Sequence, residues 1–279
     1  MDIQVGQIDL ALFPNKAGLD YYKIILTELE FSYILDEVNY DVPAFSAIFL
    51  SPHQHFELIG KVNTPSSVTQ IMFNGDYYCI ELHKHDVACN GLLFNAVYQL
   101  PHVLLHKDVF VELLAICGKM MSLGTDAGKF RAAIMKSYLQ LILALTSDQK
   151  QNYIDQHTYF SQLTTADGVI FQDLVEQYYR TEKTIAFYAD SMHMTAEALS
   201  KTVKKSLRKS PSKIIQERTI LEAKKLLHLT YKSVKEIAQE LCFHDQFYFS
   251  RYFKNIVGLS PQKYRQAVGI SAAANLSKQ

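Results

Sequence analysis

The feature that most constrains this chain is an internal repeat in its C-terminal half. The stretch LSKTVKKSLRKSPSKI, which begins at Leu199, aligns with FSRYFKNIVGLSPQKY, which begins at Phe249, at a constant offset of 50 residues. Basic, serine and proline positions agree in the two copies: Ser200 with Ser250, Lys201 with Arg251, Lys204 with Lys254, Ser210-Pro211 with Ser260-Pro261, and Lys213 with Lys263. The same structural unit is therefore expected twice.

Each copy has a short helix, a tight turn and a longer helix whose basic residues lie opposite its apolar anchors. Upstream the offset falls to 49, where Ala189 and Met192 match Ala238 and Leu241, so the second copy gains one residue, in the turn HDQ. This is the plan of a helix-turn-helix, in which the second helix lies in the major groove of DNA. A plain helical hairpin with a solvated basic face is the alternative for either copy, but duplication with matched basic positions favours DNA binding.

One long helix joins the copies. Ser210 is its expected N-cap, and Pro211 lies in its first turn. About 19 residues give a length of roughly 28 Å, which suits two recognition helices placed near the ~34 Å repeat of successive major grooves. Helical periodicity predicts the whole C-terminal set at 169–180, 184–192, 196–207, 211–229, 233–241, 246–257 and 261–268.

Charge divides the chain into an acidic and a basic half. Residues 1–165 hold ten Lys and Arg against 17 Asp and Glu, a net of −7, and residues 166–279 hold 18 against 11, a net of +7. The basic half points to a polyanion as partner, here double-stranded DNA. A solvated basic surface, or a contact with the acidic half, would give the same sum.

With these residues in place, the C-terminal half resembles the DNA-binding domain of the AraC/XylS family of bacterial transcription regulators. The resemblance runs from about Asp167 to Ala267 and is strongest in the second copy. The matching positions there are Phe243, Asp245, Phe249, Ser250, Arg251, Phe253, Lys254, Gly258, Pro261, Tyr264 and Arg265. It implies a sequence-specific DNA-binding transcription regulator, controlled by a small-molecule effector, and not an enzyme.

The resemblance implies which side chains face DNA. They are Glu197, Ser200, Lys201 and Lys204 in the first copy, and Gln246, Phe247, Tyr248, Arg251 and Lys254 in the second. Arg251 and Lys201 are the candidates for base contact, since both can bond guanine O6 and N7, while Lys204 and Lys254 suit phosphate. Leu199, Phe249 and Phe253 are core anchors, and packing within the domain is the alternative for Phe247 and Tyr248.

The sequence departs from the family pattern at three places. Cys242 occupies the position after the short first helix where the family usually has Gly. A residue with a side chain must therefore adopt the backbone conformation of the turn. In the first copy, Val203 replaces the usual Phe, and Arg208-Lys209 replaces the Gly that ends the recognition helix. The first unit is therefore the more divergent of the two.

The N-terminal half predicts strands followed by helices. From Tyr40 to about His106, short segments rich in Ile, Val, Phe and Tyr alternate with turns, and YYCIELHKH at 77–85 has the period of two of a half-buried strand. Helical spacing follows from Lys107 to about Leu145, with Gly124-Thr125-Asp126 as the turn between two helices. Several short strands in succession suggest a small antiparallel barrel or sandwich. The order of strands followed by helices resembles the cupin-like barrel and helix pair of sensing domains in this family.

The fold class is therefore α+β with two domains, a β-barrel with an amphipathic helix pair and an all-α domain with two helix-turn-helix units joined by a long helix. The expected division is 1–160 for sensing and dimerisation, 161–168 as linker, 169–270 for DNA binding and 271–279 as a flexible tail. The second helix of the pair has a broad apolar surface, which indicates a homodimer or, alternatively, burial within one chain.

A metal site is the alternative function of the N-terminal half. His53 and His55, with Glu57, share one strand face, and His83 and His85, with Glu81, share another, so a barrel could bring the pairs together as in enzymatic cupins. However, HQHFE lacks the spacing of the full cupin motif. No cofactor is expected, and the runner-up function is a metal-dependent cupin enzyme or metal sensor fused to a DNA-binding domain.

Composition excludes several other classes. Apolar residues make up 48% of the chain and charged residues 20%, which is typical of folded globular protein. The four cysteines have no regular spacing, the N-terminus lacks the pattern of a signal peptide, and the apolar run Leu139–Leu145 is too short for a bilayer. These features predict a cytoplasmic protein without a membrane partner, and no nucleophile-elbow or nucleotide-binding motif indicates catalysis.

Overall fold

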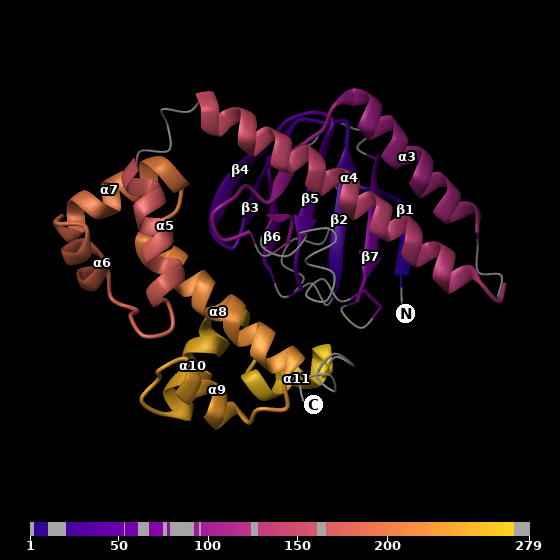
Figure 1. Cartoon of the computed structure of the whole chain (residues 1–279). Helices are drawn as coiled ribbons and strands as arrows, with labels where there is room; N and C mark the ends of the chain where they lie inside the picture. The colour runs from indigo at the N-terminus through magenta and orange to yellow at the C-terminus, as the bar shows by residue number, and fades with distance from the viewer. Residues whose placement is uncertain are drawn as a thin grey trace. The chain divides into compact units, whose positions relative to one another are not determined.

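The structure is a computed structural model, and it divides the chain into two compact units (Figure 1). It describes residues 3–10, 21–52, 54–60, 67–74, 77–78, 92–94, 96–123, 128–160 and 166–270, without the side chains of 156–160. The first unit comprises Met1–Ala96 and Leu100–Tyr153, and the second comprises Ile154–Gln279 together with a short distant segment, Val97–Gln99.

The described strands of the first unit form two antiparallel sheets. Their bounds are β1 Ile3–Asp9, β2 Tyr22–Thr27, β3 Phe31–Leu35, β4 Val38–Val42, β5 Ser46–Leu50, β6 Phe56–Ile59, β7 Ser67–Phe73 and β8 His102–Leu104. One sheet has the order β1-β7-β2-β5-β8 and the other β4-β3-β6. In the first sheet Ile25 of β2 pairs with Ile48 of β5 and with Gln70 of β7.

The larger sheet is buried on both faces because its strands alternate apolar residues between two cores. Ile24 and Phe49 belong to a core completed by helices α3, Lys107–Ser122, and α4, Arg131–Phe160. Their neighbours Ile25 and Ile48 belong to the other core, between the larger sheet and β3, β4 and β6. The period of two thus gives this unit three layers: helices, large sheet, small sheet.

This arrangement corrects the predicted barrel and corresponds to the alternative, a sandwich of two sheets. Among the described residues, the strands pair as two sheets that share a core, and no ladder joins one sheet to the other. The predicted strand at 77–85 lies outside the described residues except for Tyr77 and Tyr78, which are in a turn. Strands β1 to β3 were not expected, while the two predicted helices are confirmed, and α4 extends well beyond its expected end near Leu145.

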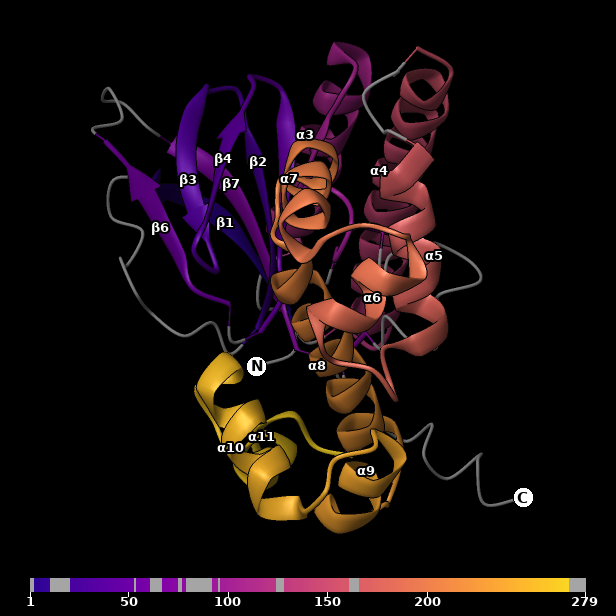
Figure 2. The ribbon, with the colours of Figure 1, turned by 90° about the vertical axis from the view of Figure 1, so that its left-hand side faces the viewer.

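The second unit is helical from Ala166 onward, as predicted. Its helices are α5 Ala166–Tyr178, α6 Ile185–Ser191, α7 Ala196–Leu207, α8 Pro211–Leu229, α9 Val234–Glu240, α10 Gln246–Val257 and α11 Pro261–Val268. Four of these have the predicted bounds, and α5 begins three residues earlier than expected. Both views show α8 running from the α5–α7 group to the α9–α11 group (Figures 1 and 2).

Helix α8 contributes to two apolar cores. Ile214 and Ile215, near its start, pack with α5, α6 and α7, whereas Ala223 and Leu227 pack with α9, α10 and α11. Among the described residues these are two separate clusters, one for each copy of the repeat. The relative placement of the copies therefore depends on what holds the middle of α8.

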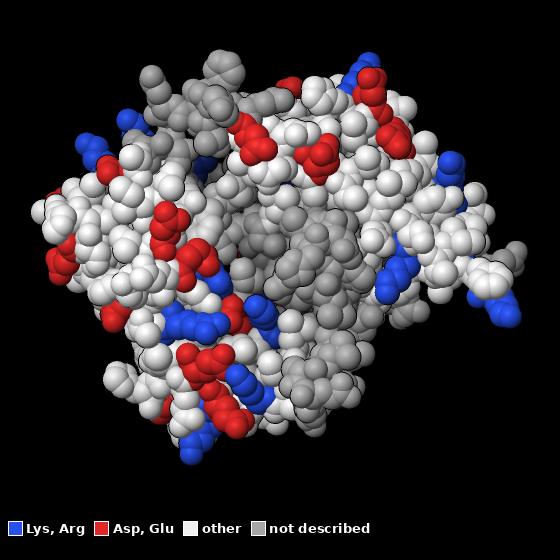
Figure 3. All heavy atoms as spheres, in the orientation of Figure 1, with Lys and Arg blue, Asp and Glu red and all other residues white. Residues whose placement is uncertain are grey.

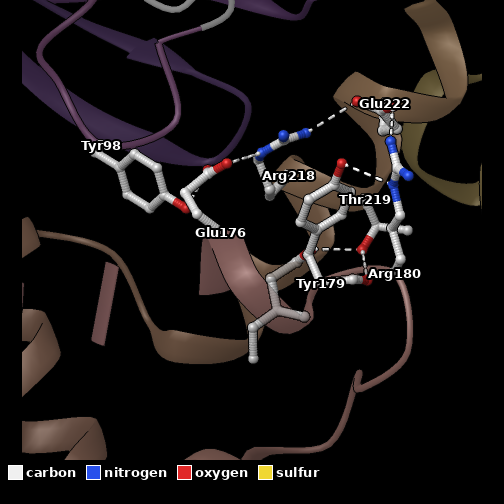
Figure 4. Close-up of polar contacts among 8 residues, drawn as sticks. Tyr98, Glu176, Tyr179, Arg180, Arg218, Thr219 and Glu222 are labelled. Atoms are coloured by element: carbon white, nitrogen blue, oxygen red, sulfur yellow. Dashed lines mark hydrogen bonds and ion pairs between the residues drawn. The ribbon is translucent and has the colours of Figure 1, made fainter. Parts of the chain in front are cut away.

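A charged network surrounds that middle (Figure 4). The side chain of Glu222 on α8 is only 5% exposed, and it accepts hydrogen bonds from Arg180 at 2.7 Å and from Arg218 at 3.4 Å. Arg218 also stacks on Tyr179, its guanidinium carbon 3.8 Å from the ring centroid, and Arg180 Nε donates to the Tyr179 hydroxyl at 3.0 Å. Helix α8 is in this way fixed to the end of α5.

The loop between α5 and α6, which contains Tyr179 and Arg180, also contacts the second copy of the repeat through Lys183. The Lys183 ammonium donates to the backbone carbonyl of Leu241, at the end of α9, at 2.7 Å and lies 4.7 Å from the centroid of the Phe243 ring.

Burial alone would raise the pKa of Glu222, but the positive charges of Lys225, Arg180 and Arg218, with the hydrogen bond from Arg180, lower it below its usual value. The carboxylate thus stabilises the fold as an anion.

We expect Glu222→Gln to lower the free energy of unfolding by about 2 kcal/mol at pH 7, because it removes the anion that pairs two arginines. A lowered pKa in the folded state means that this stabilisation is present above the unfolded value of about 4.5 and is lost as pH falls through the folded value. The difference between variant and wild type should therefore shrink in acid. Urea titrations followed by circular dichroism at several pH values measure it.

Glu240→Gln is the matched control for that experiment. Glu240 pairs with Lys232 at 2.6 Å, but the Lys232 side chain is 45% exposed and that of Glu240 is 26% exposed, against 5% for Glu222. An exposed pair contributes little, so the control should change stability by less than about 0.5 kcal/mol. Equal effects of the two substitutions would contradict the role given to Glu222.

Candidate nucleic-acid interface

The two helix-turn-helix units have the same backbone hydrogen bonds in their turns. In the first unit, which comprises α6 and α7, the amide of Met194 donates to the carbonyl of Ala189 at 2.9 Å. In the second, which comprises α9 and α10, the amide of Phe243 donates to the carbonyl of Ala238 at 2.8 Å. Donors and acceptors are each 49 residues apart, so this hydrogen bond recurs at the same place in both turns.

Both turns contain one residue in the left-handed backbone region. His193 has φ 55° and Cys242 has φ 54°, and they occupy the same place in the two units. Cys242 is the position where the sequence departs from the expected Gly, so a residue with a side chain does take the left-handed turn. Such a backbone is unfavourable for residues other than Gly, Asn and Asp.

The second helix of each unit begins with a capping side chain. The Thr195 hydroxyl accepts a hydrogen bond from the amide of Ala198, and the Asp245 carboxylate accepts from the amides of Phe247 and Tyr248, both at 2.7 Å. These caps satisfy amides that the helix itself leaves unpaired. The extra residue of the second copy, His244, lies directly before the cap Asp245.

Each recognition helix ends in a left-handed residue, Arg208 in the first unit and Gly258 in the second. Two residues later a serine caps the next helix: the Ser210 hydroxyl accepts from the Lys213 amide and the Ser260 hydroxyl from the Lys263 amide, both at 3.3 Å. Arg208 therefore adopts the conformation for which the family pattern has Gly. The predicted N-cap and first-turn proline of α8 are confirmed.

The two recognition helices bury matching faces. Leu199 and Val203 on α7 and Phe249 and Phe253 on α10 are all buried, at positions 50 residues apart. The predicted DNA-facing residues lie on the other faces. Glu197, Lys201, Lys204, Phe247, Tyr248, Arg251 and Lys254 are exposed, and Ser200 and Gln246 are partly exposed.

Phe247 and Tyr248 are the least expected members of this set. Phe247 is 71% exposed at the first turn of α10, which is unusual for so large an apolar side chain. Tyr248 is 49% exposed, and its ring lies 5.9 Å from that of Phe243. Tyr248 thus packs against the domain on one side while its other side faces solvent, so the two interpretations of this residue are compatible.

Charge on the helical unit is mixed. On the face drawn in Figure 3, acidic and basic side chains interleave over this unit, without a single basic patch across that view. The net charge of +7 therefore does not by itself locate a DNA surface. The repeated positions on α7 and α10 are the more informative signal.

Replacing the left-handed Cys242 by Gly should relieve an unfavourable backbone conformation, and we expect the free energy of local opening to rise by about 1 kcal/mol. Native-state hydrogen exchange of amides in α9 and α10 measures this change. Cys242→Ala is the control, because Ala keeps the unfavourable backbone and should give no gain. A gain with Ala as large as with Gly would contradict the argument from strain.

Comparison with known proteins locates this region in a family. A family model described as a helix-turn-helix domain matches residues 188–267. The chain is 30% identical over 94 residues to the HTH-type transcriptional regulator YisR of Bacillus subtilis, covering 34% of this chain and 33% of that protein. It is also 30% identical over 96 residues to the raffinose operon transcriptional regulatory protein RafR of Pediococcus pentosaceus, covering 34% and 35%.

The match spans about a third of the length of these relatives. Among solved structures, the C-terminal domain of AraT, a response regulator from Geobacillus stearothermophilus, is 26% identical, with 40% of this chain and 93% of that chain covered and a TM-score of 0.37. The family match, residues 188–267, begins within α6 and includes α7 and the whole of the second helix-turn-helix unit. Over this region the chain is similar to the helix-turn-helix domains of transcriptional regulators.

Proposed function

We propose that this protein is a sequence-specific regulator of transcription that binds double-stranded DNA with α7 and α10. The observation that carries the proposal is the repeated exposure pattern of these helices. Lys201 and Lys204 on α7 recur as Arg251 and Lys254 on α10, exposed in both cases and opposite buried anchors. A major groove admits one α-helix, and the joining helix α8, about 28 Å long, suits two consecutive grooves.

Individual roles follow from side-chain chemistry. Arg251 and Lys201 are proposed to bond guanine O6 and N7, and Lys204 and Lys254 to contact phosphate. Exposed Phe247 suits apolar contact with a thymine methyl group. The remaining proposed contacts come from Glu197, Ser200, Gln246 and Tyr248.

The N-terminal unit is proposed to sense a small-molecule effector and to form a homodimer, with 1–160 as its extent, 161–168 as linker, 169–270 as the DNA-binding domain and 271–279 as a tail. On α4, Met135, Leu139 and Ile142 are buried in the core. The same helix exposes Ile134 by 40% and Leu141 by 42%. Burial within the chain accounts for one face of α4, and an apolar face remains for a second copy.

The metal-site alternative stays a prediction. His53, His83 and His85 lie outside the described residues, and His55 is exposed, with its backbone amide donating to Asp36 at 2.9 Å. Within the described part of the chain, no group of three His, Cys, Asp or Glu side chains is placed to hold a metal. Metal analysis of purified protein tests it.

Among the described helices, none combines the length and apolar character needed to cross a bilayer.

Arg251→Ala should weaken binding to a selected DNA site by about 1–3 kcal/mol and relax sequence preference at one position, because it removes a base contact. Lys254→Ala is the comparison: loss of a phosphate contact should weaken all sequences alike and lower the salt dependence by about one unit of slope. Binding-site selection from random DNA followed by titrations at several salt concentrations measures both. Wild-type protein that binds all sequences equally would remove the proposed function.

The dimer proposal predicts that wild-type protein sediments as a dimer at micromolar concentration and that Ile134→Glu with Leu141→Glu sediments as a monomer, since charges would face each other across the apolar contact. Val111→Glu is the control, because Val111 is an apolar residue of α3 that is 55% exposed. It should leave the dimer intact. Monomeric wild-type protein under these conditions would exclude the proposed interface.

A further inference from the structure

A three-residue segment of the N-terminal half belongs to the helical unit. Val97–Gln99 precede β8 closely in sequence, yet they pack with the helices of the second unit. The next residues are held in the first unit: the amide of Phe49 donates to the carbonyl of Pro101 at 2.9 Å, and the Lys150 ammonium donates to the carbonyl of Leu100 at 2.5 Å. The chain therefore enters the helical unit and leaves it within a few residues.

Val97 completes the core of the first helix-turn-helix unit. Its side chain is 6% exposed and belongs to the apolar cluster that contains Phe171 of α5, Leu199 and Val203 of α7, and Ile214 of α8. Leu199 and Val203 form the buried face of α7, opposite its proposed DNA-facing residues. Val97 is thus placed to hold the recognition helix from behind and does not cover its reading face.

The backbone of Val97 is anchored by a buried lysine. Lys209 follows Arg208, the C-cap of α7; its side chain is 8% exposed, and its ammonium donates to the Val97 carbonyl at 3.0 Å. The same ammonium pairs with Glu217 of α8 at 2.7 Å. In the second copy the matching residue is Leu259, whose side chain is apolar and has no hydrogen-bond donor.

Tyr98 forms a second anchor (Figure 4). Its hydroxyl donates to Glu176 of α5 at 2.8 Å, and the single N–H of Arg218 Nε is shared between the two carboxylate oxygens of Glu176, at 2.7 and 2.9 Å. Burial and the nearby Glu176 carboxylate raise the pKa of Tyr98, so its phenol remains a donor. Tyr98 is therefore connected, through Arg218, to the network that fixes α8.

Two departures from the repeat coincide at this segment. Val203 is smaller than its counterpart Phe253, and Lys209 is polar where Leu259 is apolar. Interiors are close-packed, so a smaller side chain requires other atoms in its place. Val97 supplies apolar atoms to the cluster of Val203, and its carbonyl supplies a partner for Lys209.

We propose that Val97–Gln99 is a strap through which the N-terminal unit controls the first helix-turn-helix unit and not the second. Within the described residues, the apolar core of the second helix-turn-helix unit consists only of side chains between Val234 and Val268 and side chains of α8. A displacement of β5 or α4 that carries Leu100 and Pro101 would draw the strap from the first core. That release would loosen α7 while α10 keeps its structure, so the protein would lose one half of its DNA site.

Hydrogen exchange of the full-length chain tests the strap without DNA. In Tyr98→Phe we expect amides of α7 to exchange about fivefold faster, the equivalent of one lost hydrogen bond, and in Val97→Ser faster still. Amides of α10 should keep their wild-type rates. Unchanged exchange in α7, or equal acceleration in α7 and α10, would overturn the proposal.

Tyr77→Phe is the matched control. Tyr77 also donates a hydroxyl hydrogen bond, to the Ala132 carbonyl at 3.1 Å, but within the first unit. It should leave α7 exchange unchanged, and acceleration there as large as in Tyr98→Phe would count against a specific strap. Tyr98→Phe removes only one oxygen atom, so it keeps the test decisive if Val97→Ser does not fold.

The consequence for DNA rests on the proposed function and needs its own measurement. Hydroxyl-radical footprinting on a selected site should show Tyr98→Phe losing protection of the half-site contacted by α7, with the α10 half-site protected as in wild type. Equal loss on both halves would overturn the selective control of α7. Absence of specific binding by wild-type protein would refute the proposed function and leave the exchange result to decide the strap.

Discussion

The arrangement of the helical unit depends on one helix that contributes to two cores. Because Ile214 and Ile215 belong to the first core and Ala223 and Leu227 to the second, α8 determines how far apart the two recognition helices lie. Apolar burial alone would not fix its rotation, since burial is not directional. The paired arginines at Glu222 add direction at the middle of the helix, beside the core residues Ile220 and Ala223.

How much the sequence predicts depends on whether the interactions are local. The helices from 196 to 268 were predicted closely because their ends are set by neighbours in sequence, such as Ser210 bonding the amide of Lys213 and Asp245 bonding that of Tyr248. The residues that the family resemblance proposes as DNA-facing lie opposite the buried Leu199 and Phe249, as helical periodicity requires of one exposed face.

The sheets were harder to predict because strand pairing is not local. Strand β1 pairs with β7, more than fifty residues away, and the doubly buried β2 and β5 read as apolar runs without alternation. The barrel expectation came from counting short strands, which does not tell one closed sheet from two sheets that share a core. Val97 was missed for the same reason: its sequence neighbours give no sign that Lys209 binds its carbonyl or that its side chain joins the cluster of Leu199 and Val203.

The departures from the repeat are informative because repetition supplies the comparison. At Cys242 a change of residue leaves the backbone unchanged, for His193 at the matching place takes the same left-handed conformation. At Val203 and Lys209 the change alters what the unit packs against, because both residues meet a segment that has no counterpart beside Phe253 and Leu259 in the described structure. Two copies with one fold thus differ in what they need for stability: the second core is complete within its own stretch of chain, and the first draws on Val97. Under the proposed control by Val97–Gln99, a single chain has one recognition helix whose packing depends on a distant segment and one whose packing does not.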